Sequence, residues 1–294
     1  MMNVAVVAHR KKKLDGGLGE LRRVLADRGF PDSLWYEAAK SRETSALARR
    51  AVDEGADLLF IWGGDGTVQR CVDAVARADV TLAILPEGTA NLLATNLEIP
   101  KSLVEAVDVG LSGVDRRLDV GVLNGQRFTV MAGVGFDAVM MHLADDSLKD
   151  HLGRLAYVWS GTRATRMKSR TMRIKVDGKQ WFSGDASCVL LGQFGVLTGS
   201  IIAFPDSSPD DGLLEVGVVT VENAGQWMRV LSRKVLGHAD NSPLTELTQG
   251  RKVDIKLSRP TRYELDGGAR KQKKRLRARI EPGAIVIRVS VPDQ

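Results

Sequence analysis

Residues 58–75 read Leu-Leu-Phe-Ile-Trp-Gly-Gly-Asp-Gly-Thr-Val-Gln-Arg-Cys-Val-Asp-Ala-Val, and the rest of the chain is organised around this stretch. Its apolar run, residues 58–62, predicts a buried strand, and residues 63–66 predict a tight turn. Apolar residues then recur at positions 68, 71, 72 and 75, which is the spacing of one helix face. A strand therefore leads through a glycine turn into a helix, with Thr67 placed to cap that helix.

This turn is suited to hold a phosphate group. A helix N-terminus offers backbone N–H groups and partial positive charge, and glycines let a phosphate approach them closely. A glycine turn without a ligand is the alternative, because such turns are common in α/β folds. Asp65 favours a functional turn, since a carboxylate beside a phosphate is explained by metal binding or by proton acceptance.

The first 120 residues alternate strands and helices, the pattern of a parallel sheet covered on both faces. Outside the central stretch, strands are predicted over 3–9, 34–36 and 81–85, and helices over 18–25 and 46–52. Gly88 and Thr89 form a second strand-to-helix turn. Ligands of open α/β sheets bind outside the carboxyl ends of the strands, so we expect both turns to face one crevice.

After residue 120 the sequence predicts a mainly antiparallel, β-rich half. Asn124-Gly125 and Asp177-Gly178 each separate two short strand-like runs, which is a strong hairpin signal. Helices are predicted within 148–166 and over 224–236, and further strands over 186–192, 213–221, 253–257, 263–266 and 285–291. We expect an α/β domain over 1–120 and a β-rich domain over 121–284, with residues 285–294 returning to the first.

Composition and charge indicate a soluble globular protein, with 44% apolar and 27% charged residues in 294. Cys71 and Cys188 lie in apolar segments, as reduced thiols of a cytoplasmic protein do. No run approaches the roughly 18–20 apolar residues of a membrane span, and no signal peptide is recognisable. The oligomeric state stays open, a homodimer included.

The net charge of +6 is concentrated in two basic runs, residues 9–13 and 270–279. Each run is either a solvated loop or a contact to phosphates or to an anionic lipid surface, such as the inner face of a membrane. Nucleic acid is disfavoured as a partner, because aromatic residues make up only 5% of the chain and none interleave these runs.

Four motifs, taken together, resemble the catalytic-domain family of diacylglycerol kinases and sphingosine kinases, and most closely the small bacterial soluble lipid kinases. They are Gly63-Gly64-Asp65-Gly66-Thr67, Pro86-x-Gly88-Thr89-Ala90-Asn91, Ser208-Pro209-Asp210-Asp211-Gly212-Leu213-Leu214 and Leu265-Asp266-Gly267. NAD kinases share the first motif, whereas the second favours the lipid branch.

The resemblance implies a Rossmann-like α/β domain that binds ATP and a C-terminal antiparallel β-sandwich-like domain that completes a cleft for a lipid hydroxyl. The implied activity is ATP-dependent phosphorylation of diacylglycerol or a related lipid at a membrane surface. A Mg²⁺ site is implied at Asp211, with backbone oxygens of Ser208 and Leu213, since hard oxygen ligands suit magnesium. The implied nucleotide contacts are Gly63, Gly64, Asp65, Gly66, Thr67, Val68, Gln69, Arg70, Gly88 and Thr89.

Asp65 is expected to be the key carboxylate, as base or as organiser of metal and water. Asp266 is the second choice, and its alternative is a turn aspartate before Gly267. The chain departs from the family pattern where bacterial members carry a glutamate, because Gly268 cannot accept a proton. A non-catalytic nucleotide- or lipid-binding homologue is therefore one alternative function, and the motif shared with NAD kinases makes an NAD-kinase-like enzyme the other.

The loop after the first strand also departs from the family, which has Asn-Pro-x-x-Gly there. This chain has Ala8-His9-Arg10-Lys11-Lys12-Lys13 instead, so Arg10 or Lys11 is expected to contact phosphate. A threonine common in the family's second nucleotide loop has no clear match near residues 38–41.

Overall fold

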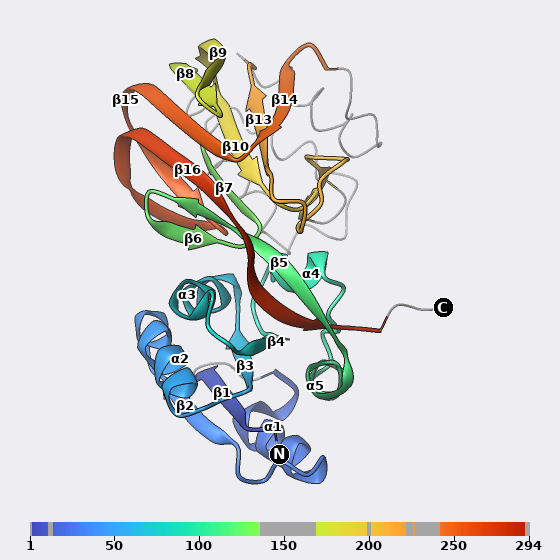
Figure 1. Ribbon diagram of the computed structural model, residues 1–294. Helices are drawn as coiled ribbons and strands as arrows, with labels where there is room; N and C mark the ends of the chain where they lie inside the picture. Colours follow the sequence, from blue (N-terminus) through green and yellow to red (C-terminus); the bar gives the residue numbers. More distant parts are fainter. Residues whose placement is uncertain are drawn as a thin grey trace. The chain divides into compact units, whose positions relative to one another are not determined.

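The computed structural model describes residues 2–10, 14–135, 169–198, 201–221, 226 and 242–291. The chain divides into two compact units (Figure 1). Unit 1 consists of Met1–Val120 with Pro282–Gln294, and unit 2 of Gly121–Glu281. Two strands, β5 (Val114–Leu123) and β16 (Gly268–Val289), carry the chain from one unit into the other.

Unit 1 is an α/β unit built on a parallel sheet, which confirms the predicted fold class. Its elements before β5 are β1 (Val4–His9), α1 (Gly17–Asp27), β2 (Leu34–Ala38), α2 (Thr44–Asp53), β3 (Leu58–Gly63), α3 (Asp65–Val75), β4 (Thr81–Pro86), α4 (Leu92–Asn96) and α5 (Leu103–Ser112). The strand order is β16-β4-β3-β1-β2. All of these neighbours pair in parallel.

The central strand β3 lies between β1 and β4, and all of its residues are buried. Phe60 and Trp62 are among the largest fully buried side chains. An unbroken apolar run is required here because neither face of the strand meets water. This burial fixes the carboxyl end of β3, where Gly63 leads into α3.

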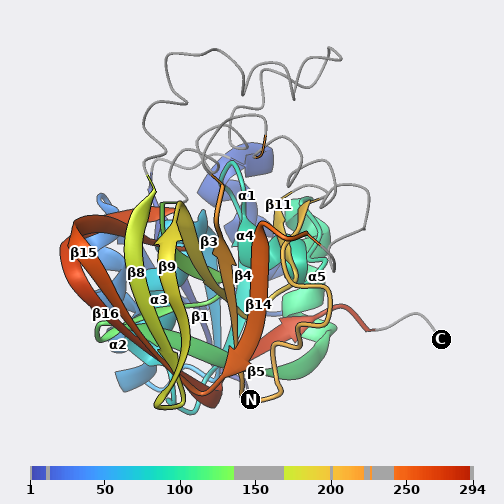
Figure 2. The ribbon, with the colours of Figure 1, turned by 90° about the horizontal axis from the view of Figure 1, so that it is seen from above.

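Unit 2 is an antiparallel β unit, as predicted, with strand order β14-β13-β10-β7-β15-β16. β8 pairs with β15 and β9, and β5 pairs with β6; Figure 2 shows β8 and β9 side by side, near β15. The strands between β5 and β16 are β6 (Gln126–Phe128), β7 (Met131–Val134), β8 (Arg170–Val176), β9 (Lys179–Ala186), β10 (Cys188–Gly192), β11 (Val196–Thr198), β12 (Ile201–Ile202), β13 (Leu214–Val219), β14 (Thr245–Gly250) and β15 (Lys252–Leu265).

Both predicted hairpin turns are confirmed. Asn124 and Gly125 join β5 to β6 with φ of 51° and 84°, and Asp177 and Gly178 join β8 to β9 with φ of 49° and 83°. Left-handed φ at both central residues is the condition for a type I′ turn, which matches the twist of the flanking strands.

Alternation along the strands builds the core of unit 2. In β15, Val253, Ile255 and Leu257 are buried, while the intervening residues face outward. β16 repeats the pattern with Leu276 and Ala278. One face of this sheet is therefore apolar and packed, and the other carries polar side chains.

Two local expectations are wrong. Helix α3 begins at Asp65, with Gly64 as an N-cap that has no side-chain bond, so Thr67 lies inside the helix instead of capping it. The run 270–279 is not a loop but part of β16, because Leu276 and Ala278 pack into the core.

Two further elements were not predicted. Helix α5 buries Leu103, Ala106 and Val107, which have the spacing of one helix face. Strand β14, Thr-Glu-Leu-Thr-Gln-Gly, contains a single large apolar side chain and so lacks an apolar pattern. The helices predicted over 148–166 and 224–236 lie outside the described residues, residue 226 apart. Across the described ranges, the helices are all too short or too polar to cross a membrane.

Candidate active site

The two glycine turns predicted to share a crevice lie against each other in unit 1. They follow neighbouring strands, since Gly63 at the end of β3 is paired with Pro86 at the end of β4. A Cβ atom on Gly64 would lie 3.1 Å from the Cα of Gly88, and the N–H of Glu87 donates to the carbonyl of Gly63 at 3.1 Å. The turns are therefore in direct backbone contact.

Asp65 ties the first turn to the second. As the first residue of α3, it accepts a hydrogen bond on Oδ1 from the backbone N–H of Leu92, at 2.5 Å. Leu92 is the first residue of α4, so a carboxylate lies at that helix N-terminus, where negative charge is favourable. The half-buried Asp65 side chain is thus held at the meeting point of the turns, and not in a packed interior.

Asn91 shapes the second turn from within. Its φ of 47° is left-handed, a conformation that asparagine tolerates better than most residues. Its Nδ2 donates to the carbonyl of Gly88 at 2.9 Å, which closes the turn before α4. Asn91 Oδ1 is buried and has no hydrogen-bond partner among the described residues.

The N-terminus of α3 is open to an anion. Gly66 is exposed, and a Cβ atom placed on it would meet nothing within 4 Å. The N-cap residue, Gly64, has no side chain with which to cap the helix. Open space above an uncapped helix N-terminus, with glycine permitting close approach, is what phosphate binding requires.

The remaining predicted nucleotide contacts differ in what they can offer. Thr67, Val68 and Gln69 have buried side chains, so a ligand would reach only their backbone. Arg70 is half-buried and Thr89 is exposed. Together with Asp65, these two residues are the predicted nucleotide contacts whose side chains a ligand could reach.

Arg10 and Lys11 were predicted to contact phosphate. Arg10 is exposed, and its Nε lies 3.5 Å from Oε2 of Glu37. The other oxygen of Glu37 lies 3.5 Å from Nη2 of Arg22. The charge of Arg10 is therefore shared with a carboxylate, while Lys11 lies outside the described residues.

Asp266, the second candidate carboxylate, lies in unit 2 in the turn between β15 and β16. It is 5% exposed, and its oxygens accept four hydrogen bonds, from the N–H and Oγ1 of Thr129 and from the N–H groups of Val130 and Met131. Burial raises the pKa of Asp266, and the bonds from these donors oppose the rise. This geometry fits the alternative of a turn aspartate that anchors residues 129–131.

Gly268, where the family pattern places a glutamate, packs against an arginine. A Cβ atom on Gly268 would lie 2.8 Å from Nη1 of Arg270, which donates to the Gly268 carbonyl at 2.9 Å. Arg270 Nε also donates to Oε1 of Gln126 at 2.9 Å. The space of a side chain at position 268 is therefore partly taken by a guanidinium group.

The predicted metal loop is ordered by its own aspartates. Oδ1 of Asp211 accepts from the N–H of Leu213 at 2.8 Å, and Oγ of Ser208 donates to Oδ1 of Asp210 at 2.6 Å. Within the described ranges, three or more His, Cys, Asp or Glu side chains nowhere gather in a group that could hold a metal ion. The loop thus offers two exposed carboxylates, Asp210 and Asp211, plus backbone oxygens.

A buried glutamate near this loop was not anticipated from the sequence. Glu215 is 7% exposed, and its Oε1 accepts from Nε2 of Gln249 at 2.7 Å. Burial raises the pKa of Glu215, and the negative charges of Asp211 and Asp206 raise it further, against the Gln249 bond. In the sequence, the one indication of a special role for Glu215 is that it is a charged residue in an otherwise apolar strand.

Comparison with known proteins identifies the family. The model of the diacylglycerol kinase catalytic domain matches residues 8–123, and that of the YegS C-terminal NAD kinase beta sandwich-like domain matches residues 129–289. A diacylglycerol kinase of Bacillus subtilis (strain 168) is 30% identical over 258 residues, 85% of this chain and 83% of that protein. The chain belongs to the diacylglycerol kinase family.

Solved structures support the same fold for this diacylglycerol kinase family member. A diacylglycerol kinase from Bacillus anthracis str. Sterne superposes with a TM-score of 0.77 at 20% identity, over 98% of this chain and 97% of that one. An NAD kinase from Archaeoglobus fulgidus, solved with ATP, gives a TM-score of 0.53 at 14% identity, over 98% and 93% of the two chains. At these identities the likeness concerns the fold alone.

Proposed function

We propose that this protein is an ATP-dependent lipid kinase that phosphorylates a hydroxyl group of diacylglycerol or a related lipid at a membrane surface. Family membership supports the reaction class. The structural observation that carries the proposal is the bond from Leu92 N–H to Asp65, which holds an acid and two glycine turns at one edge of the parallel sheet. Phosphoryl transfer needs this combination of phosphate binding and a placed carboxylate.

In the reaction, the lipid hydroxyl oxygen forms a bond to the γ-phosphorus of ATP. The bond from that phosphorus to the bridging oxygen breaks, and ADP leaves with the electron pair. The hydroxyl proton passes to a carboxylate, which we assign to Asp65. The backbone around Gly66 and Gly88 holds the phosphates, so that the transferred group and the acceptor oxygen lie in line.

Magnesium is part of the same proposal. One carboxylate, together with substrate phosphates and water, is a common Mg²⁺ ligand set, and Asp211 with backbone oxygens of Ser208 and Leu213 fits it. The acidic neighbours Asp206 and Glu215 make this region attractive to a cation. When bound, Mg²⁺ neutralises phosphate charge as it develops.

An NAD-kinase-like activity is the second candidate, and the shared fold with an NAD kinase solved with ATP is the observation in its favour. A homologue that binds a nucleotide without transferring phosphate is the third, because Gly268 replaces a family glutamate. The family match at residues 8–123 favours the lipid kinase over the NAD kinase, whereas the non-catalytic homologue is distinguished by the assay that follows.

One assay separates these functions. The protein is incubated with ATP labelled at the γ-phosphate, Mg²⁺, and either diacylglycerol in mixed micelles or NAD. We expect labelled phosphatidic acid. Labelled NADP would support the NAD-kinase reading, and ATP binding without any labelled product would overturn the proposed activity.

A further inference from the structure

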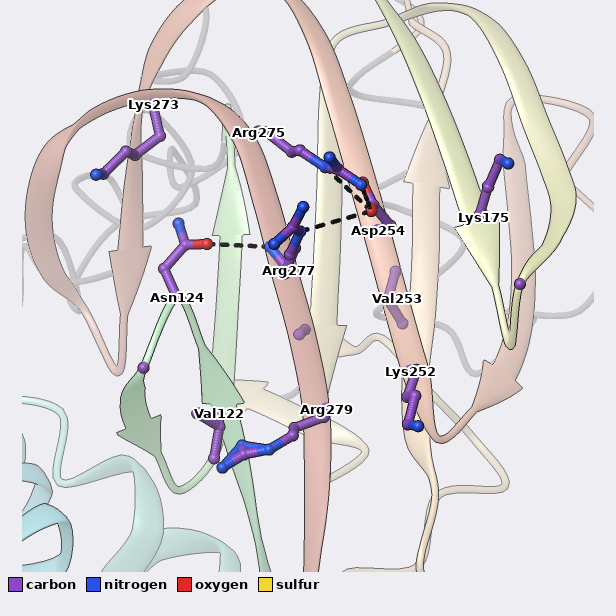
Figure 3. Close-up of a pocket in the computed structure, with 13 residues that line it drawn as sticks. Val122, Asn124, Lys175, Lys252, Val253, Asp254, Lys273, Arg275, Arg277 and Arg279 are labelled. Atoms are coloured by element: carbon purple, nitrogen blue, oxygen red, sulfur yellow. Dashed lines mark hydrogen bonds and ion pairs between the residues drawn. The ribbon is translucent and has the colours of Figure 1, made fainter.

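A strongly basic surface covers one side of the sheet formed by β8, β15 and β16 in unit 2. It includes a concavity of about 830 Å³, which Figure 3 shows in close-up. Six cations and one carboxylate line it, a net charge of +5. We call this surface the basic face, and its charged residues in the concavity are Lys175, Lys252, Asp254, Lys273, Arg275, Arg277 and Arg279.

The basic face is built by strand periodicity, not by a loose charged loop. Arg275, Arg277 and Arg279 are exposed, whereas Leu276 and Ala278 between them belong to the core. Successive side chains of a strand point to opposite faces, so a run of alternating arginines puts all its charges on one face. The apolar core thereby fixes the direction in which these cations point.

Cross-strand register places like charges opposite each other. Lys252 is paired with Arg279, and Lys256 is paired with Arg275 on one side and with Arg173 on the other. Like charges directly opposite across an antiparallel pair are destabilising. Within residues 252–256 and their described partners, Asp254 is the one acid, opposite Arg277 and Lys175, so these pairs of the basic face carry more positive than negative charge.

Internal acids neutralise only part of the basic face. Asp254 bonds to Nε of Arg275 at 2.9 Å and lies 3.8 Å from Nε of Arg277, as the dashed lines in Figure 3 show. Within the described part of the chain, Lys175, Lys252 and Lys273 form no ion pair. These lysines leave three positive charges for a partner.

The extent of the basic face indicates what kind of anion it fits. From Lys273 to Arg279 the strand advances six residues, or roughly 20 Å at about 3.3 Å per residue. A single phosphate group cannot span this distance. The described residues lining the concavity include no aromatic side chain on which a nucleic-acid base could stack.

We infer that the basic face docks the protein onto the anionic surface of a lipid bilayer. This inference rests on the proposed lipid kinase function, which requires access to a substrate held in a membrane. Charge complementarity supports it, because a bilayer rich in anionic lipid presents an extended negative surface to an extended positive one. The attraction falls with ionic strength, since exposed charges are screened over about 10 Å at 0.1 M salt.

The test uses the full chain and measures vesicle binding without ATP or diacylglycerol, so its outcome does not depend on catalysis. Vesicles of phosphatidylcholine alone are compared with vesicles that also contain phosphatidylglycerol, at low and high salt. The test variant is Lys175→Gln, Lys252→Gln, Lys273→Gln. The control variant removes the same charge from exposed residues of unit 1, as Arg42→Gln, Arg49→Gln, Lys101→Gln.

We expect the native protein and the control to bind only the anionic vesicles, and the test variant to bind them at least about tenfold more weakly. The test variant should melt close to the native protein, because substitutions of exposed side chains outside the core change stability little. Equal binding by the test and control variants would overturn the inference. Tighter binding to a DNA duplex than to anionic vesicles at the same salt would assign the basic face to nucleic acid instead.

Discussion

Gly88 approaches Gly64 so closely that a Cβ atom added to Gly88 would lie 2.7 Å from the Cα of Gly64. Because this contact is between backbone atoms, no side-chain rotation could remove the clash that a larger residue at position 88 would cause. Asp65 strengthens the same junction through its bond to Leu92. The two turns consequently form one structural unit, and a change in either should be felt in both.

Replacing Gly88 should therefore damage both fold and binding. Gly88→Ala forces the turns apart, and its methyl group would also press on Asn91 Oδ1, 2.7 Å away. We expect the free energy of unfolding to fall by about 1–3 kcal/mol, the usual cost of overpacking. Chemical unfolding with and without ATP measures both effects, and unchanged values would contradict the close approach.

Gly66→Ala is the matched variant, because a methyl group there meets open space. Alanine favours helix over glycine, so the free energy of unfolding should stay equal or rise by up to about 1 kcal/mol. ATP affinity should nevertheless fall by roughly tenfold, since the methyl group occupies the approach to the N-terminus of α3. Native ATP affinity in this variant would show that phosphate binds elsewhere.

Asp65→Asn separates the chemical role of Asp65 from its structural one. The asparagine oxygen can still accept the bond from Leu92 N–H, so we expect the fold to persist and the free energy of unfolding to fall only by the lost charge at the helix N-terminus, about 0.3–1 kcal/mol. Phosphoryl transfer should fall by at least roughly a hundredfold, the usual scale for losing a placed proton acceptor. Asp73→Asn, on the same helix, serves as control, and near-native turnover in Asp65→Asn would rule out the assigned role.

Glu215 should make stability depend on pH. Its pKa in the folded protein lies above the ordinary 4.5, chiefly because of burial, so the folded state holds the proton more tightly than the unfolded chain. Its contribution to stability is complete below pH 4.5 and is lost as the pH rises through the folded-state pKa. Native stability should therefore decline over that interval.

The isosteric variant Glu215→Gln keeps an oxygen for the Gln249 bond and removes the charge. Its free energy of unfolding should change less with pH over the same interval and exceed the native value at neutral pH, as measured in chemical denaturation without divalent cations. Parallel curves for the two proteins would contradict the pKa shift. Mg²⁺ bound at Asp211 would lower the pKa of Glu215, so adding Mg²⁺ should narrow the difference.

Gly268→Glu asks whether the missing family glutamate limits the enzyme. The new side chain would displace Arg270 or pair with it, because Nη1 of Arg270 lies in its path. Since we assign proton acceptance to Asp65, we expect turnover in the labelled-ATP assay to change by less than about tenfold, below the usual effect of a general base. A larger gain in turnover would show that a glutamate at position 268, and not Asp65, is the better proton acceptor.

The sequence was most informative where one physical requirement dominated. The buried run of β3, the glycine turn after it and the two Asn-Gly and Asp-Gly hairpins were all predictable, because each depends on local burial or on left-handed φ. β14 was not, because its pairing with β13, and not an apolar pattern, makes it a strand. Tertiary context supplied what local propensity lacked.

The candidate site was predictable in its parts but not in its connections. Motif spacing pointed to Asp65 and Gly88, yet nothing in the sequence showed that Asp65 bonds to Leu92. For Asp266 the motif suggested chemistry, whereas its bonds to residues 129–131 are those of the alternative, a turn aspartate. The basic run 270–279 was interpreted as a loop, because its sequence does not show that Leu276 and Ala278 pair with Ile255 and Val253 of β15.

The long strand β16 has a consequence for how the protein is made. Val286 and Ile287 of this strand pair with Thr81 and Leu82 of β4, so the parallel sheet of unit 1 is completed by residues that follow the whole of unit 2 in the chain. During translation, that edge of β4 therefore stays uncovered until unit 2 has been synthesised. Chaperone demand during translation should accordingly depend on how fast the segment after unit 2 emerges.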